Sequence, residues 1–252
     1  MSSEKGSAGS LKYLHPVLTC EQSLAFEREY FGGDKNLEWK AMNRAGTAIA
    51  RQASLDVKET FGDGELQTIL VLVGKGHNGG DAIIATRHLL NKNPDAVGLL
   101  VFPFGLGHLR PLVRRSLDDL QVARGKRLKF LSLRKFSVNA QLETFLHKDR
   151  IDLCLDGILG MQFRPPLLSP AKELIEWMNQ RENLRIRIAV DVPSGIGDNS
   201  DDSVFRADFT YATGIAKAGL FDLNSRAFVG RIRYQDLGFF AGPSVGSNRS
   251  VV

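Results

Sequence analysis

The sequence has few cysteines, no long apolar run and no cluster of histidine and cysteine. Cys20 and Cys154 are the only cysteines in 252 residues, which excludes a disulfide framework and a zinc–cysteine site. No stretch approaches the roughly 18 apolar residues of a membrane-spanning helix. The opening "MSSEKGSAGS" lacks the apolar segment of a signal peptide. We therefore expect a cytoplasmic protein with no membrane segment.

The charge is weighted to one sign. The formal net charge is +5, and much of the excess falls in one stretch. A nucleic acid or another acidic partner is one interpretation of such a stretch. Asp118 and Asp119 interrupt it, and aromatic residues do not alternate with its basic ones as base stacking requires, so a solvated helix face is favoured. Its basic residues are Arg110, Arg114, Arg115, Arg124, Lys126, Arg127, Lys129, Arg134 and Lys135.

Short apolar runs alternate with segments of helical character. Two helices are predicted first, over Leu18 to Tyr30 with Thr19 as its cap, and over Asn36 to Val57. Later helices are expected at 81–91, 109–125, 136–148 and 170–183. The predicted strands span 68–73, 97–102, 128–133, 151–159, 186–192 and 208–213. Continuous apolar strands between helices indicate a three-layer α/β sandwich with a mostly parallel sheet. We expect one domain over residues 18–240, with flexible ends at 1–17 and 241–252.

A glycine-rich loop, "VGKGHNGGDAII", lies where the first of these strands meets a helix. Its glycines match G-x-G-x-x-G, and such a turn presents backbone N–H groups to an anion. An NAD(P)-dependent dehydrogenase also carries an acidic residue or an arginine after the next strand, but that strand ends in "VFPFG". The Walker A pattern fails too. A turn that needs glycine only for tight packing is the alternative, although packing alone does not require Asn78 and Asp81.

Three carboxylates follow three different predicted strands. Asp81, Asp156 and Asp191 are thereby expected at one rim of the sheet, where they would repel one another unless a cation or a shared proton relieves them. Each alone is more often a helix cap or a loop hydrogen bond. Lys217, after a further strand, is placed to balance the acidic group.

Four of these motifs occur together in a known family. "GKGHNGGDA", "DGILG", "DVPSG" and "AKAG" appear in the order and at about the separations seen in the YjeF N-terminal domain family, the NAD(P)H-hydrate epimerases. The opening helices resemble that family as well, so the resemblance covers about Leu18 to Gly238. It implies a Rossmann-like fold, a homodimer and a bound potassium ion. It also implies interconversion of the two epimers of hydrated NADH and NADPH, which an ATP- or ADP-dependent dehydratase then returns to use.

The resemblance assigns roles to particular residues. Asn78, Asp156 and Ser194 match the potassium ligands. Asp191 matches the residue at the reacting ring and Lys217 matches a site lysine, and these two are the expected catalytic residues. Substrate binding falls to the glycine-rich loop and to two residues beyond it, namely His77, Asn78, Gly79, Gly80, Asp81, Gly160 and Asp191. His77 stands where the family usually has Asn, Ala82 where it has Gly, and Gln162 where a second glycine is expected.

The expected chemistry centres on Asp191. The ring nitrogen of the substrate expels the neighbouring hydroxyl, and water returns to either face, so epimerisation needs a group that can donate and accept a proton. A carboxyl group at a strand end followed by Pro193 suits this role. Two other functions stay open. The first is a non-catalytic binding module of the kind found in messenger-RNA decapping scaffolds, and the second is an enzyme that acts on another phosphorylated nucleotide.

Overall fold

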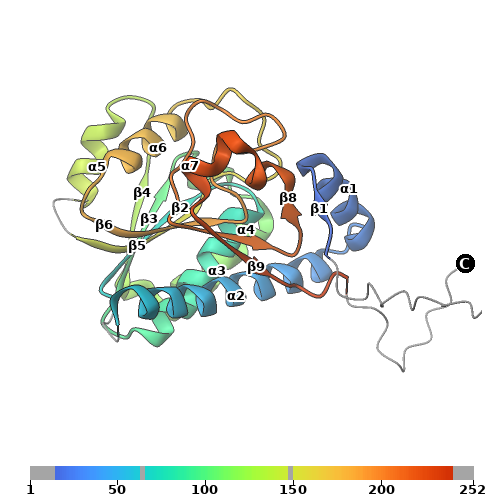
Figure 1. The fold of residues 1–252 in the computed structure, drawn as a ribbon. Coiled ribbons are helices and arrows are strands. Elements are labelled where there is room, and N and C mark those ends of the chain that lie inside the picture. Colours follow the sequence, from blue (N-terminus) through green and yellow to red (C-terminus); the bar gives the residue numbers. More distant parts are fainter. Residues whose placement is uncertain (1–14, 63–65, 147–149, 241–252) are drawn as a thin grey trace, which may run out of the picture.

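The computed structural model describes residues 15–62, 66–146 and 150–240. A seven-stranded sheet with the order β4-β3-β2-β5-β6-β7-β9 forms the centre, and every neighbouring pair is parallel. A second sheet pairs β1 (Val17–Leu18) with β8 (Ala216–Lys217). Figure 1 shows this arrangement. The three-layer α/β fold predicted from the sequence is confirmed, and the central sheet is wholly parallel among the described residues.

The strands and helices alternate over most of the chain. The central strands are β2 (Thr68–Val73), β3 (Val97–Phe102), β4 (Leu128–Ser132), β5 (Ile151–Gly157), β6 (Leu184–Val190), β7 (Phe209–Thr213) and β9 (Arg231–Gln235). The α-helices are α1 (Cys20–Phe31), α2 (Lys35–Phe61), α3 (His77–Lys92), α4 (Pro111–Arg124), α5 (Val138–Leu146), α6 (Ala171–Gln180) and α7 (Arg226–Val229). Within the described residues, no helix is both long enough and apolar enough to cross a bilayer.

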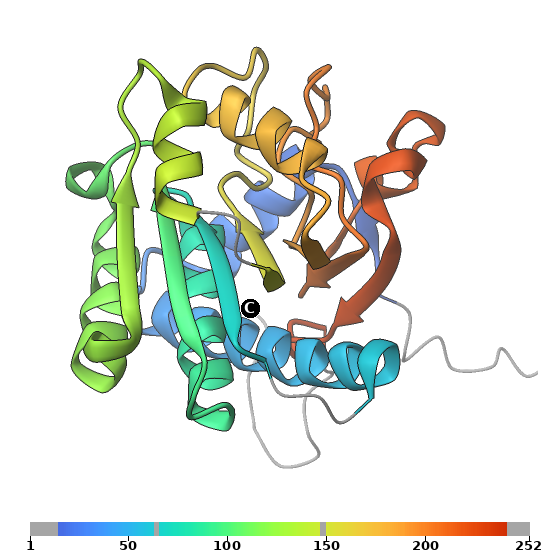
Figure 2. The ribbon, with the colours of Figure 1, turned by 90° about the vertical axis from the view of Figure 1, so that its left-hand side faces the viewer.

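The two faces of the sheet are covered by different helices (Figures 1 and 2). Side chains alternate along a strand, so Ile69 and Val71 of β2 join the apolar core formed with α2, α3 and α4. Leu70 and Leu72 of the same strand join the core formed with α5 and α6. Both faces of the strand are therefore buried, which explains why its sequence is continuously apolar.

Most predicted elements differ from the structure only at their ends. Thr19 caps α1 as predicted, and its side chain accepts from the Gln22 N–H while the Gln22 side chain accepts from the Thr19 N–H. Leu18 was expected inside that helix and instead lies in β1 beside Lys217. β9 was not predicted, because its sequence "RIRYQ" is polar and half-exposed. Part of the helix predicted at 136–148 falls on residues 147–149, which lie outside the described residues, as do 1–14 and 241–252.

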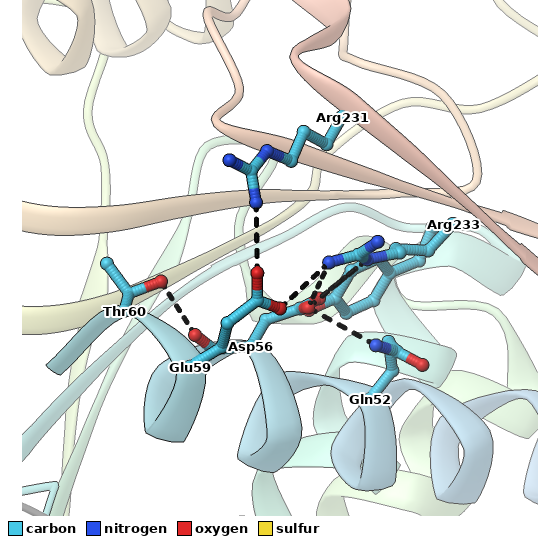
Figure 3. Close-up of polar contacts among 7 residues, drawn as sticks. Gln52, Asp56, Glu59, Thr60, Arg231 and Arg233 are labelled. Atoms are coloured by element: carbon cyan, nitrogen blue, oxygen red, sulfur yellow. Dashed lines mark hydrogen bonds and ion pairs between the residues drawn. The ribbon is translucent and has the colours of Figure 1, made fainter. Parts of the chain in front are cut away.

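A buried polar cluster fastens α2 to the edge of the sheet (Figure 3). Asp56 of α2 is 1% exposed and accepts from Arg233 Nη2 at 2.7 Å, Arg233 Nε at 3.1 Å and Tyr211 Oη at 2.7 Å. Gln52 Nε2 donates to it at 3.3 Å, and Glu59 extends the cluster to Arg231 at 3.2 Å. Both carboxylate oxygens of Asp56 are thus bound by donors.

Candidate active site

The strand order reverses beside β2, so the loops after β2 and β5 leave toward opposite halves of the sheet and a crevice opens between them. β2 lies between β3 and β5, so the chain leaves β2 toward one edge of the sheet and returns to start the other half at β5. In parallel sheets, ligands bind at the carboxyl ends of the strands at such a point. The loops after β2, β5, β6 and β7 meet there, since residues from all four line one cavity.

The glycines of the loop after β2 have two different uses. A Cβ on Gly74 would lie 1.9 Å from the Ile158 oxygen, and one on Gly79 would lie 2.2 Å from the Gly74 oxygen. These two glycines let backbone segments approach closely, as the packing interpretation of the motif expected. Gly76 differs, because a Cβ there would meet nothing within 4 Å. Gly76 is the N-cap of α3, and no side chain caps that helix. The first backbone N–H groups of α3 are therefore left for a ligand.

The neighbouring positions of this loop also pack closely. A Cβ on Gly80 would lie 2.6 Å from Met42 Sδ, and one on Gly160 would lie 2.5 Å from Asn78 Oδ1. Ala82 is fully buried and its methyl faces Gly157, where an added Cβ would lie only 2.8 Å away. The methyl group of Ala82 is thus accommodated by the glycine opposite.

The three predicted cation ligands are brought together through Leu159. Asn78 Nδ2 donates to the Leu159 oxygen at 2.9 Å, and the Leu159 N–H donates to Ser194 Oγ at 2.9 Å. Ser194 donates through Oγ and N to the two oxygens of Asp156, at 2.7 and 2.8 Å. Burial raises the pKa of Asp156 to about 6, although the hydrogen bonds from Ser194 oppose the rise.

This set has the donor chemistry of a monovalent cation site. Its side chains offer oxygen atoms, and Asn78 Nδ2 donates to the carbonyl oxygens of Leu159 and Val190, which holds the Asn78 side chain in place. Oxygen ligands of this kind suit hard cations. No group of three or more His, Cys, Asp or Glu side chains that could hold a metal ion occurs within the described ranges. The oxygen atoms of these residues fit an alkali cation.

Asp191 and Lys217 form a buried ion pair. Lys217 Nζ lies 2.5 Å from Asp191 Oδ1, and the two residues are 1% and 3% exposed. Thr213 donates to the same oxygen through Oγ1 at 3.1 Å and through N at 3.2 Å. Asp191 also has φ of 69°, a left-handed conformation that costs about 1–3 kcal/mol in a residue other than glycine and clusters at functional sites.

These residues line a small cavity, which we call the acidic cavity. Its volume is about 60 Å³, and its floor carries several carboxylates. Asp81 is 7% exposed and its Oδ1 has no hydrogen-bond partner. Burial, with Asp191 and Glu27 nearby, raises the pKa of Asp81 well above its ordinary range, and Lys217 opposes the rise. The lining includes Glu27, Phe31, Glu38, Met42, His77, Asn78, Asp81, Met161, Asp191, Thr213, Lys217, Leu237 and Phe239.

Sequence reasoning missed the contribution of the first two helices to this cavity. Burial raises the pKa of Glu27 to about 7, although Lys217 opposes the rise. Glu38 lies 3.7 Å from His77 Nε2, and burial lowers the pKa of that histidine. Nothing in the sequence marks either glutamate, since each sits in an amphipathic helix among other charged residues. Cys20 is also buried nearby, with its pKa raised to about 12 chiefly by burial, which leaves it an inert thiol.

A second cavity, which we call the basic cleft, adjoins the first across His77 and Asn78. Its volume is about 260 Å³. Lys75 and Arg110 line it, and no carboxylate does. Arg110 Nη2 donates to Gln162 Oε1 at 3.0 Å across the cleft. A third hollow of about 500 Å³, between α1 and the start of α4, shares His77 and Arg110 with it.

Other members of the basic stretch have structural partners. Arg127 donates to the carbonyl oxygens of Leu90, Asn93 and Ala96 at 2.9–3.0 Å. The Arg115 guanidinium stacks 4.1 Å from the centre of the Trp39 ring system. These side chains hold neighbouring elements together, which agrees better with a helix face and its flanks than with a nucleic-acid surface.

The fold and this site define a doubly wound α/β protein of Rossmann type, with its polar centre at the carboxyl ends of the strands. A model of the family described as "YjeF-related protein N-terminus" matches residues 39–219, so the chain belongs to this family. The NAD(P)H-hydrate epimerase of Elusimicrobium minutum is 29% identical over 214 residues, which cover 82% of this chain and 87% of that protein.

Two further relatives extend the comparison. The bifunctional NAD(P)H-hydrate repair enzyme Nnr of Pyrobaculum aerophilum is 31% identical over 220 residues, which cover 83% of this chain and 40% of that protein. The crystal structure of the yeast protein ynu0 superposes with a TM-score of 0.62 at 19% identity, over 79% of this chain and 81% of that one. This second likeness supports the fold.

Proposed function

We propose that the protein is an NAD(P)H-hydrate epimerase, an isomerase that interconverts the R and S forms of hydrated NADH and NADPH. The observation that best supports this function is the buried Asp191–Lys217 ion pair. The pair lines the same cavity as Asp81, next to the N-terminus of α3, where no side chain caps the helix. A buried ion pair is weak evidence for stability alone, because desolvation offsets its attraction. The names of the relatives point to the same reaction.

The two carboxyl groups at the acidic cavity, Asp81 and Asp191, have different surroundings. Lys217 Nζ and Thr213 Oγ1 donate to Asp191 Oδ1, and this carboxylate would stabilise the cationic ring that forms when the hydroxyl leaves. Burial raises the pKa of Asp81 well above its ordinary range, and its Oδ1 has no hydrogen-bond partner, so the protonated form of Asp81 is favoured at the same cavity. Pairs of carboxyl groups with opposed environments divide acid and base work in this way. We therefore propose that Asp81 shares with Asp191 the proton transfer that the sequence analysis gives to Asp191 alone.

The acidic cavity by itself is smaller than the roughly 300–1,000 Å³ of most ligand pockets. It holds about 60 Å³, while the basic cleft and the third hollow add about 260 and 500 Å³ beside it. A dinucleotide therefore occupies the three together. Phe31 and Phe239 also line the acidic cavity, and we expect their side chains to move when a nicotinamide ring enters.

The proposal also includes a bound cation, an oligomeric state and a partner enzyme. Asn78, Asp156 and Ser194 would hold a potassium ion, whose charge would offset the surrounding carboxylates; the oxygen donors described above support this. We further propose a homodimer in the cytoplasm that works with an ATP- or ADP-dependent dehydratase. The bifunctional repair enzyme among the relatives supports that partnership.

The test is an epimer-exchange assay. Purified R-form hydrated NADH is incubated with the protein and the appearance of the S form is followed by chromatography, with and without potassium. We expect exchange well above the rate in buffer, lost when tetramethylammonium replaces potassium. Exchange at the buffer rate in potassium would refute the epimerase and favour the binding module. Full activity in tetramethylammonium would refute the potassium site alone.

A further inference from the structure

Charge is divided sharply between the two adjoining cavities. The acidic cavity carries Asp81, Asp191 and two glutamates, whereas the basic cleft is lined by Lys75 and Arg110 with no carboxylate. A ligand that spans both would carry a cationic group at one end and an anionic group at the other. A dinucleotide whose ring becomes cationic during reaction has this distribution, with its diphosphate as the anionic group.

Arg110 is held at the edge of the basic cleft by its backbone. Its N–H donates to the Lys75 oxygen at 3.1 Å, which ties the start of α4 to the glycine-rich loop. It is the N-cap of α4, its side chain caps nothing, and Pro111 follows it. A residue before proline is restricted to extended conformations. The backbone is therefore fixed, and the side chain is left to reach across the cleft.

The guanidinium group of Arg110 is not neutralised. Its side-chain partner is the Gln162 amide oxygen at 3.0 Å, and no carboxylate of the described segments pairs with it within 4.0 Å. A neutral amide orients the group without cancelling its charge. The open N-terminus of α3 at Gly76 lines the same cleft. A guanidinium group binds phosphate oxygens in a bidentate manner.

We propose that Arg110, held across the basic cleft by Gln162, binds the diphosphate of the dinucleotide substrate and so sets the position of its hydrated ring over the acidic cavity. This inference rests on the proposed function for the ring, but the anion site is testable without it. Gln162 is a positioning residue in this arrangement, since it acts through Arg110.

The first experiment measures binding by calorimetry, with inorganic pyrophosphate and ADP as probes. Arg110→Leu should weaken both by about 10- to 100-fold, the range that one charge-assisted pair supplies. Lys126→Leu is the matched control, because it removes one positive charge from the same basic stretch at an exposed position outside the three cavities. Unchanged binding by Arg110→Leu, or an equal loss in the control, would overturn the proposal.

Two substitutions at Gln162 separate positioning from packing. Gln162→Ala keeps the charge of Arg110 and should weaken pyrophosphate by about 3- to 10-fold. Gln162→Glu keeps the bridge but neutralises the guanidinium, so it should weaken binding about as much as Arg110→Leu. If the bridge only held the loops together, Gln162→Glu would bind pyrophosphate as the wild type does, and the proposal would fail.

The second experiment uses exchange kinetics with three substrates. Arg110→Leu should raise KM about 10- to 100-fold for hydrated NADH and hydrated NADPH alike, with kcat within about 2-fold. It should leave hydrated reduced nicotinamide riboside, which has no phosphate, unchanged. A loss confined to hydrated NADPH would overturn the proposal, because Arg110 would then contact the ribose phosphate. If the wild type shows no exchange but binds pyrophosphate through Arg110, the proposed reaction fails and the anion site stands.

Discussion

Asp56 and Asp191 are both buried carboxylates paired with a basic side chain, and they differ in what surrounds them. Asp56 is bound at both oxygens by Arg233, Tyr211 and Gln52 (Figure 3). Asp191 takes its hydrogen bonds from Lys217 and Thr213 on Oδ1 alone, in a left-handed backbone conformation at the wall of a cavity.

The difference separates a structural contact from a reactive one. Asp56 lines none of the three cavities described above, and its hydrogen bonds with Tyr211 and Arg233 fix α2 to β7 and β9. Asp191 keeps an oxygen outside its network, beside the unpartnered Asp81. Strain and incomplete hydrogen bonding destabilise a fold, so they persist where function requires them.

Neutralising Asp191 should have the largest effect. We expect Asp191→Asn to lower the turnover of epimer exchange by about 10²- to 10⁴-fold, because asparagine neither carries the charge nor exchanges a proton. It also leaves Lys217 buried without a counter-charge, so the free energy of unfolding should fall by about 3–5 kcal/mol. Exchange kinetics and urea denaturation measure the two effects.

A double variant distinguishes the two roles of Asp191. Asp191→Asn combined with Lys217→Met removes both charges and should recover most of the stability while it stays inactive. Near-normal exchange in either variant would show that Asp191 is not the reacting group.

Neutralising Asp56 should lower stability and leave the exchange activity almost unchanged. Asp56→Asn is expected to lower the free energy of unfolding by about 2–4 kcal/mol, because Arg233 and Tyr211 lose a shared charged acceptor. Exchange per folded molecule should stay within about 2-fold of the wild type. Glu59→Gln is the control, since that side chain is 59% exposed, and it should change stability by less than about 0.5 kcal/mol. A kinetic defect in Asp56→Asn would show that Asp56 contributes to the reaction and is not only a structural contact.

Two glycines of the same loop extend the comparison to the backbone. Gly79→Ala should destabilise the fold by about 1–3 kcal/mol, because its Cβ would lie 2.2 Å from the Gly74 oxygen. Gly76→Ala should cost less, no more than about 1 kcal/mol for a poorer N-cap residue, since a Cβ there meets nothing within 4 Å. Thermal unfolding of both variants checks this, and equal losses would mean that Gly76 packs as closely as Gly79.

The last effect concerns Glu27, which is only partly buried, and it is a change in how stability depends on pH. Its pKa is raised from 4.5 to about 7, so the folded state binds more protons than the unfolded state between these values. The contribution of Glu27 to stability is therefore lost as the pH rises from 4.5 to 7. Glu27→Gln should flatten the stability profile in this window, whereas Glu29→Gln, an exposed neighbour on α1, should not. Superimposable profiles of wild type and Glu27→Gln would contradict the assignment.

The order of elements was predictable because it depends on local pattern. Apolar runs bounded by glycine or aspartate predicted every central strand but β9, whose polar residues form the sheet edge. The same logic predicted that Asp81, Asp156 and Asp191 lie at one rim with Lys217 beside them, because parallel strands end on the same side. In the structure, Asp81, Asp191 and Lys217 line one cavity.

The sequence by itself determined the sandwich, the rim and the residues that end the strands, since these follow from hydrophobic period and strand polarity. Only the tertiary structure decided that Asp191 is paired with Lys217 while Asp81 is buried with an unpartnered oxygen, because burial and contacts depend on neighbours far away in the chain. Glu27 of α1 enters the cavity of Asp191, and Arg110 meets Gln162 across the basic cleft. Such contacts arise when helices and loops with no shared sequence pattern pack together, and their electrostatics depend on distances that a sequence does not contain.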